Sequence, residues 1–519
     1  MFTKRFLLSI AILLLAVPSL WSQTISYITP DIGAPGMNTY VEFIAAHTAV
    51  GTFGTDGFYL NNSGDALRVE CADAADTQRV TIGPVVVSWN GRMLATQIFV
   101  HPDQQPPSYD WNVVGADFQI PLRVVVNGLA GNSQVFTIVR PQSAVLTAAN
   151  GTLGSGGIWG VRSPRGAMIF DSLQLDGAQY DVSLIDPDAS TPGNQAYLPA
   201  VILSKGPIRT ASSTIIQVNG SGKRGGPGGG GGGGSFCDFT GDGTDGGDGF
   251  TGGGRGGRNR AGNPFGSDEY RNPGLGSGAF IGVTGGSLNG VSGGTSPAYE
   301  ATGGGTGHPF GTSGEGCGSG SGCNPPGGYG GGSGQQQTMN GGGGGYATAG
   351  QSSRNNNGGN VHGNAMIVPF AGGSGGGGGN PQLGFACSGD GGGGGGALRL
   401  YGRSIDTYLI TADGAGGGSG SSAHGGGGSG GAISAEAKFI SGLWKLRALG
   451  GSGVGSNGGG GRLRMDGPIG WFSGGLPVDE SLYFGPSTDT TSFVTRNFTL
   501  TGTGNGNTID LYVKSDRMP

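Results

Sequence analysis

Runs of glycine recur through the middle of this chain, at residues 225–234, where one proline interrupts the run, and at 341–345, 375–379 and 391–396. Glycine has no side chain to bury, and it loses more conformational freedom on ordering than any other residue. A chain with 121 glycines among 519 residues therefore uses them either as flexible spacers or as backbone that packs against backbone. The segments that flank the runs distinguish these two interpretations.

The flanking segments repeat. Residues 391–424 can be laid over residues 425–457, and a third copy opens at Gly458, an interval of about 34 residues that is typical of repeat architectures. Each copy holds a glycine run, an alternating segment (ALRLY or AISAEA), a second apolar segment (YLITA or LWKLRAL) and a looser return rich in glycine and serine. A spacer has no reason to repeat apolar segments, so the pattern predicts stacked strands, as in a right-handed parallel β-helix or a related β-solenoid.

Two states remain open for the glycine runs themselves. Polyproline-II-like strands have three residues per turn and can pack side by side through backbone groups when every residue is glycine. Several such runs in one region favour a bundle of packed polyglycine-II strands beside the solenoid. The alternative is a set of disordered loops that hang from the strand repeats.

The glycine-rich region resembles the glycine-rich and parallel β-helix repeats of large secreted surface proteins of bacteria. The segments that carry this resemblance are GGGGSGGAISAEA at 425–437 and GGGGGGALRLYG at 391–402. The resemblance implies a structural or adhesive role and names no ligand.

Residues 24–143 show a different pattern, with seven short segments rich in valine, isoleucine, threonine and aromatic residues between Gly, Pro and Asn turns. This pattern predicts a β-sandwich. The opening ITPDIGAPG (28–36) and the closing VVVNGLAGNSQVFTIV (124–139) resemble an IPT/TIG-type immunoglobulin-like module, which implies a spacer or binding domain of extracellular proteins. We expect Cys71, in the segment LRVECA, to be a buried small apolar side chain.

The chain is thus expected to be all-β, with an immunoglobulin-like sandwich at 23–143, a glycine-rich solenoid at 144–475 and a cap or incomplete module at 476–519. Lys4 and Arg5 precede an apolar run from Phe6 to Val17 and small residues up to Ser22, which predicts a signal peptide at 1–22. The expected location is extracellular or on the cell surface of a Gram-negative-type bacterium. We expect no transmembrane segment in the mature chain, because no later apolar run approaches the length of a span.

Few residues suggest binding or redox chemistry. Asp238, Asp242, Asp245 and Asp248 lie on one glycine-rich stretch and are weak candidates for a Ca²⁺ site. Solvated turn residues are the preferred interpretation, because the position of the closing EF-hand glutamate holds Gly249. Otherwise no cofactor is expected. Cys317 with Cys323, and Cys237 with Cys387, are candidate disulfides.

An enzyme is a less favoured hypothesis. The best carboxylate pairs for glycan hydrolysis, Asp186 with Asp188 and Asp406 with Asp413, lack a cluster of basic residues nearby in the sequence. His308, His362 and His424 are isolated, without metal-ligand spacing. The net charge of -5 and the single Arg–Gly segment at 252–260 disfavour nucleic-acid binding.

The sequence therefore favours a secreted, non-enzymatic structural or adhesive protein of the cell surface or extracellular matrix. Its expected partners are glycans, the cell envelope or other surface proteins. The alternative is a β-helical carbohydrate-active enzyme or glycan-binding protein. Ice or mineral binding by a flat glycine-rich face is a third hypothesis, for which the sequence holds no dedicated feature.

Overall fold

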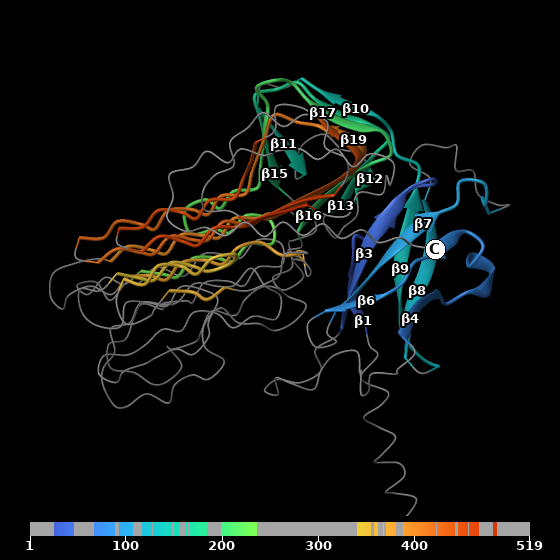
Figure 1. The fold of residues 1–519 in the computed structure, drawn as a ribbon, viewed down its shortest axis with the longest axis horizontal. Helices are drawn as coiled ribbons and strands as arrows, with labels where there is room; N and C mark the ends of the chain where they lie inside the picture. The colour runs from blue at the N-terminus through green and yellow to red at the C-terminus, as the bar shows by residue number, and fades with distance from the viewer. Residues whose placement is uncertain are drawn as a thin grey trace, which may run out of the picture. The chain divides into compact units, whose positions relative to one another are not determined.

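The computed structural model describes residues 25–45, 67–88, 93–106, 117–126, 128–147, 150–154, 161–162, 167–183, 199–235, 340–353, 358–361, 367, 370–379, 388–421, 423–441, 445–454, 456–466 and 481–484. Within these ranges the regular elements are β-strands and one short 3₁₀ helix, Ala74–Asp76. The chain divides into two compact units, Met1–Gln142 and Ser143–Pro519, and the described part of each is β structure (Figure 1). The expectation of an all-β protein is confirmed for these residues.

The first unit holds two sheets. The five-stranded sheet contains β1 (Ile25–Thr29), β3 (Asn38–Ala45), β7 (Met93–Val100), β5 (Val80–Ile82) and β6 (Val86–Ser88). The four-stranded sheet contains β2 (Ile32–Gly33), β9 (Leu129–Val139), β8 (Asp117–Val126) and β4 (Leu67–Cys71). All pairings are antiparallel except that of β2 with β9.

One apolar core joins the two sheets of this unit. Phe43 on β3 and Leu94 on β7 belong to the same buried cluster as Leu122 on β8 and Phe136 on β9. Alternate residues along β8 are buried up to Val124, as expected for strands that pack one face on a core. Cys71 lies in this cluster with 5% of its surface exposed, which confirms the expectation of a buried small side chain. Burial raises the pKa of the Cys71 thiol to about 11.

In the second unit, strands recur along the chain in groups, and each group pairs in parallel with the next. The opening strands are β10 (Ala144–Leu146), β11 (Asn150–Gly154) and β12 (Val161–Arg162). Two groups of three follow: β13 (Ala167–Phe170), β14 (Leu173–Leu175) and β15 (Gln179–Ser183), then β16 (Ala200–Ser204), β17 (Pro207–Thr210) and β18 (Ile215–Gln217). Only β12, which is antiparallel to β13, departs from the parallel arrangement among the described strands of this unit.

After β18 the next strand in the described part of the chain is β19 (Ala397–Asp406), nearly two hundred residues later, and it continues the same stack. Leu398 on β19 pairs with Ala200 on β16, and Ile405 pairs with Ile208 on β17. The later strands are β20 (Leu409–Thr411), β21 (Ala432–Ser441), β22 (Lys445–Arg447), β23 (Arg462–Asp466) and β24 (Ser481–Phe484). The repeat expected from the sequence is present but uneven, because Ala397 pairs with Ala432 over a longer step than Ala432 pairs with Arg462.

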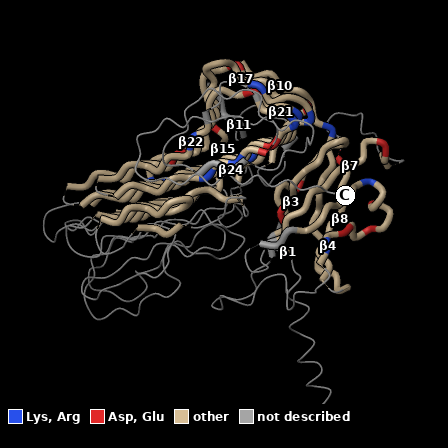
Figure 2. Tube along the Cα trace, in the orientation of Figure 1, with Lys and Arg blue, Asp and Glu red and all other residues tan. Residues whose placement is uncertain are grey.

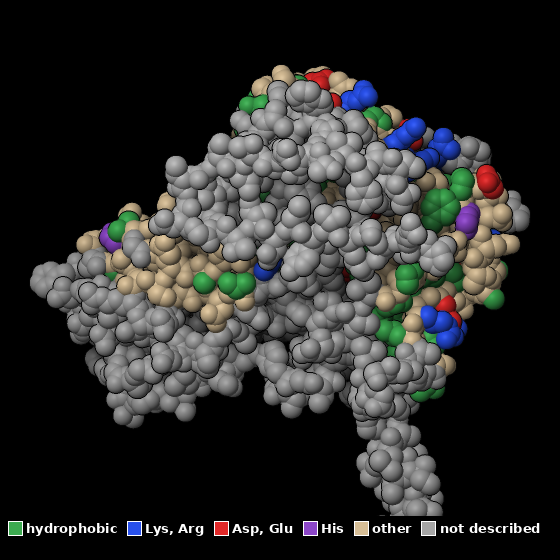
Figure 3. Space-filling view, viewed as in Figure 1, with side chains coloured by type: hydrophobic (Ala, Val, Ile, Leu, Met, Phe, Trp, Pro, Cys, Tyr) green, Lys and Arg blue, Asp and Glu red, His purple; other side chains and the backbone are tan. Residues whose placement is uncertain are grey.

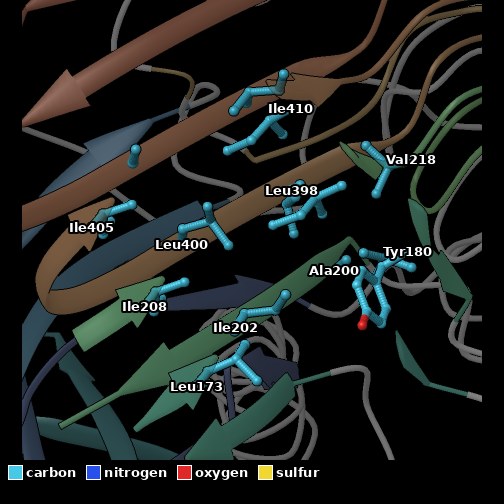
Figure 4. Packing of buried hydrophobic residues seen from close by; sticks show 14 of the residues in the cluster. Leu173, Tyr180, Ala200, Ile202, Ile208, Val218, Leu398, Leu400, Ile405 and Ile410 are labelled. Atoms are coloured by element: carbon cyan, nitrogen blue, oxygen red, sulfur yellow. The ribbon is translucent and has the colours of Figure 1, made fainter. Parts of the chain in front are cut away.

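The parallel register places apolar side chains of successive groups directly over one another in the core (Figure 4). Three ladders result: Leu173, Ile208, Ile405 and Ile440; Met168, Ile202, Leu400, Ala435 and Met465; and Tyr180, Ile216, Ile410 and Leu446. All of these residues are at most 1% exposed. Because each group buries its apolar face on its neighbours, the strands are stable only as a stack.

The glycine segments extend from the strands of this unit as a set of long parallel and antiparallel chains, seen at the left of Figure 1. Three glycine runs, 391–396, 425–431 and 458–461, lead directly into β19, β21 and β23. These chains are almost free of charged residues (Figure 2). Their visible surface is mainly backbone and side chains that are neither hydrophobic nor charged (Figure 3).

Candidate functional site

The first candidate site is the set of glycine strands, whose backbone hydrogen bonds follow a three-residue rotation. Along the run 391–396, N–H groups three residues apart donate to the same neighbour, and adjacent N–H groups donate to different neighbours. Gly391 and Gly394 donate to the carbonyls of Gly233 and Gly230, and Gly392 and Gly395 donate to those of Gly426 and Ser429. Gly393 and Gly396 donate to the carbonyls of Gly222 and Val218. The N···O distances are 2.7–2.8 Å. The rotation implies a strand with three residues per turn.

The run 425–431 is bonded in the same way on all sides. Its N–H groups donate in rotation to segments 412–418, 374–377 and 456–459. Its carbonyls accept from the N–H groups of Gly344, Gly392, Gly395, Gly451 and Arg462. A chain with donors and acceptors distributed around its axis has no single edge, so it is an interior member of a three-dimensional bundle and not a strand of a flat sheet.

Close packing of backbone excludes side chains from these positions. A Cβ atom built on Gly428 would lie 2.1 Å from the carbonyl oxygen of Gly393. At Gly391 and Gly425 the corresponding distances are 2.0 Å to Gly376 and 1.8 Å to Asp390. Real Cβ atoms are essentially never found within 3.0 Å of such an atom. The composition of the runs is therefore a steric requirement of the bundle.

A few small side chains are accommodated inside the bundle because they replace backbone partners. Ser429 and Ser374 are fully buried on adjacent strands, and the Ser374 N–H donates to Ser429 Oγ at 2.7 Å. Ser456 is also fully buried and donates from its hydroxyl to the Gly341 carbonyl. The hydroxyls of Ser429 and Ser456 thus supply hydrogen bonds between strands.

One end of the bundle is fixed by an aspartate that sequence reasoning considered as a catalytic candidate. Asp413 follows β20, and its Oδ2 accepts from Arg447 Nε and Nη2 at 2.9 and 2.6 Å. Its Oδ1 accepts from the Leu449 N–H at 3.0 Å, and its own N–H donates to Asn219 Oδ1. Asp406 instead ends β19, in a different sheet from β20. Asp413 therefore holds the glycine returns together, and Arg447 is the basic residue that binds its carboxylate.

The opposite end of the bundle, where the chains turn back, is closed by amide side chains. Asn340 donates from Nδ2 to the Val454 carbonyl at 2.7 Å, and its Oδ1 accepts from the His424 N–H at 2.9 Å. Val454 is 53% exposed between these partners. This end, defined by Asn340, His424 and Val454, is called the tip below.

The second candidate site is a charged cluster on the outer face of the sheet formed by β19, β21 and β23. The residues of these strands that alternate with the core residues form two rows of paired neighbours across the three strands, here called levels. One level holds Arg399, Ser434 and Arg464, and the next holds Tyr401, Glu436 and Asp466. Arg464 Nε and Nη2 bond to both oxygens of Asp466 at 2.5 and 3.0 Å. Figure 2 shows acidic and basic residues side by side on these strands.

The pKa of Glu436 is raised by its surroundings in this cluster. Burial, reinforced by the negative charge of Asp466, raises the pKa of Glu436 to about 7, against the opposing effect of Arg399 and Arg464. Asp466 is held by its two bonds to Arg464. At neutral pH Glu436 is therefore partly protonated, beside the ion pair of Arg464 with Asp466.

Aromatic side chains from the glycine region pack over the same outer face, one level before the charges. Tyr346, Ile367 and Phe370 form a buried cluster with Ala397 on β19 and Ala432 on β21. Arg399 lies over the Phe370 ring at 4.4 Å and Arg462 over the Tyr346 ring at 5.3 Å. The Tyr346 hydroxyl donates to the Ala371 carbonyl at 2.9 Å. This contact, here called the aromatic seam, joins Tyr346, Ile367 and Phe370 to the strands.

Most site residues expected from the sequence lie outside the described residues. These are Asp186, Asp188, Asp238, Asp242, Asp245, Asp248, Cys237, Cys317, Cys323, Cys387, His308 and His362. Within the described ranges no three His, Cys, Asp or Glu side chains gather in a way that would hold a metal ion. No helix in those ranges is long and apolar enough to cross a membrane.

The charged cluster was missed at the level of sequence, although one signal was present. GGAISAE at 430–436 and GGRLRMD at 460–466 align residue for residue from their glycines, and this alignment sets Glu436 beside Asp466. The unequal lengths of the whole repeats conceal this match.

No protein-family model, no curated protein and no solved structure matches this chain.

Proposed function

We propose that residues 143–484 form a parallel β-helix that carries a bundle of polyglycine-II strands, and that residues 25–142 form an IPT/TIG-like sandwich. The aligned ladders of the parallel strands support the first assignment. The polyglycine-II bundle is supported by the hydrogen bonds of the glycine strands, which rotate with a period of three residues. The shared core of two antiparallel sheets supports the sandwich.

On this architecture the protein is a secreted, non-enzymatic structural or adhesive component of the cell surface or extracellular matrix. The observation that carries the proposal is the glycine bundle, in which interior strands are bonded on every side and bear no side chains for chemistry. Such a bundle is a rigid projection, because bending it would break bonds between several strands at once. Its tip exposes the apolar side chain of Val454, whose carbonyl is bonded by Asn340.

The proposal is tested by cell attachment. Wild-type protein and the variant Gly428→Ala, which disrupts the bundle, are compared for retention on washed cells and for binding to glycans or envelope material. We expect both to be exported and the variant to lose retention or binding by at least tenfold. Equal retention and equal binding of the two proteins would refute the assignment of adhesion to the bundle.

A second function, carbohydrate turnover, is favoured by one specific observation, the Glu436–Asp466 pair. A carboxyl group with a raised pKa beside a second carboxyl group, here one that is ion-paired with Arg464, is the arrangement of many glycoside hydrolases. The test is release of reducing ends from a panel of polysaccharides by wild type, Glu436→Gln and Asp466→Asn. Turnover that disappears in both variants would establish this function in place of the structural one.

A further inference from the structure

The aromatic seam and the charged cluster occupy neighbouring levels of the same outer face, and one residue belongs to both. Arg399 stacks on Phe370 of the seam, and its positive charge acts to lower the pKa of Glu436 in the cluster. Its side chain is 7% exposed, so its interactions are made in a region largely withdrawn from water, where electrostatic effects are strong. A change in charge at Glu436 therefore acts directly on a seam residue.

The groups that face Glu436 determine the direction of that effect. Tyr401 on β19 and Asp466 on β23 are its register neighbours, Arg399 and Arg464 lie one level away, and Lys438, two residues along β21, is exposed. Arg464 is already bonded to both oxygens of Asp466. When Glu436 is protonated, Arg399 is left to stack on Phe370. When Glu436 ionises, it repels Asp466 and attracts Arg399 away from the ring.

We propose that the aromatic seam is a pH-sensitive contact, closed while Glu436 is protonated and loosened when Glu436 ionises. Loosening the seam releases the adjoining glycine segment 340–351 from the bundle. This segment is bonded to the run 425–431 through Gly344 and to the approach to β23 through Ala347, which donates to the Gly460 carbonyl at 3.0 Å. Acidic conditions hold the segment in place, and rising pH frees it.

Amide hydrogen exchange on the full chain at pH 6 and pH 8 tests this inference, with rates corrected for the intrinsic effect of pH. Residues 341–345 report on the seam. The run 215–220, whose N–H groups donate to the carbonyls of Ala178, Thr411 and Asp413, serves as an internal reference. We expect protection at 341–345 to fall at least tenfold between pH 6 and pH 8 while the reference changes less than twofold. In Glu436→Gln, which stays neutral, protection at 341–345 is expected to be unchanged.

Two further variants secure the interpretation. Glu70→Gln, in the first unit, removes a carboxylate whose pKa is lowered mainly by its hydrogen bond from Arg123, and it should respond to pH as wild type does. Phe370→Leu removes the ring, so 341–345 should already be less protected at pH 6 and show no further fall. A fall of equal size in wild type and Glu436→Gln, or one shared by the reference run, would overturn the inference.

Discussion

At single glycine positions in the bundle, the constraint is steric and can be stated atom by atom. Gly428 donates to the Ala415 carbonyl and accepts from Gly451, while the Gly393 carbonyl oxygen occupies the place of a side chain. Glycine is required there because of contact between chains, since its φ is not in the left-handed region. This differs from Gly36 and Gly128, whose φ values of 79° and 83° call for glycine with open space around them.

Substituting Gly428 by alanine should therefore destabilise the second unit strongly. We expect a loss of about 1–3 kcal/mol or more in the free energy of unfolding, because the methyl group forces two bonded strands apart. Denaturant unfolding measures the loss. The matched control is Gly83→Ala in the first unit, where the nearest atom, the Gln97 carbonyl oxygen, is 3.4 Å away; its effect should be small. Similar losses at both positions would contradict the steric account.

Glu436 makes stability depend on pH, and the sign follows from its pKa. The folded-state value of about 7 lies above the ordinary value of 4.5, so the native state holds this proton more tightly than the unfolded chain does. Its contribution is fully present below pH 4.5 and is lost as pH rises through 7.

We expect this loss to be on the order of 1–3 kcal/mol for the second unit, reduced from the full linkage value because the side chain is only partly buried. Unfolding free energies of wild type and Glu436→Gln measured from pH 4.5 to pH 8 test it. The variant should show a flatter profile and exceed wild type above pH 7. Parallel profiles would show that Glu436 does not carry the effect.

At the level of elements, the strands that follow glycine runs position the runs. A run of identical glycines holds no information about register, since sliding it by one residue changes no side chain. Leu398, Ile433 and Leu463 are the second residues of β19, β21 and β23, which follow their runs directly, and they pair with one another. The apolar ladder thus fixes the register that the glycines cannot specify.

Asp413 performs the corresponding role for the returning chains after β20 and β22. Replacing it by alanine removes the partner of Arg447 and of the Leu449 N–H. We expect a loss of about 1–2 kcal/mol, moderated because the Arg447 side chain is 41% exposed. Asp181→Ala is the control, since Asp181 is exposed on β15. Thermal unfolding of the two variants distinguishes them, and equal shifts in Tm would argue against a fastening role for Asp413.

The sequence predicted these elements to different degrees, for physical reasons. Alternation in ALRLY and AISAEA located the first strands of two repeats, because period-two burial is a local property. The pairing of β16 with β19 across the intervening chain could not be predicted, because no local pattern names a distant partner. The Glu436–Asp466 pair depends on the register of β21 against β23, which whole-repeat comparison does not resolve.

At the scale of the whole molecule, two kinds of interaction stabilise the fold, burial of apolar side chains and backbone hydrogen bonding between glycine strands. Residues 25–142 and the strands of the second unit are held by apolar cores. The glycine bundle buries backbone and few apolar side chains, so its order depends on hydrogen bonds between strands and on the ladders that align them. This ordering opposes a large entropy cost for glycine, and cooperative bonding on every side is what offsets it.

Amide hydrogen exchange of the runs 391–396 and 425–431 tests this account most directly. Both runs are interior to the bundle, and each N–H donates to a carbonyl of another strand. We predict protection of at least about a thousandfold over an unstructured chain, comparable to that of β19 and β21. Exchange of both runs at unprotected rates, while β19 and β21 remain protected, would contradict the account.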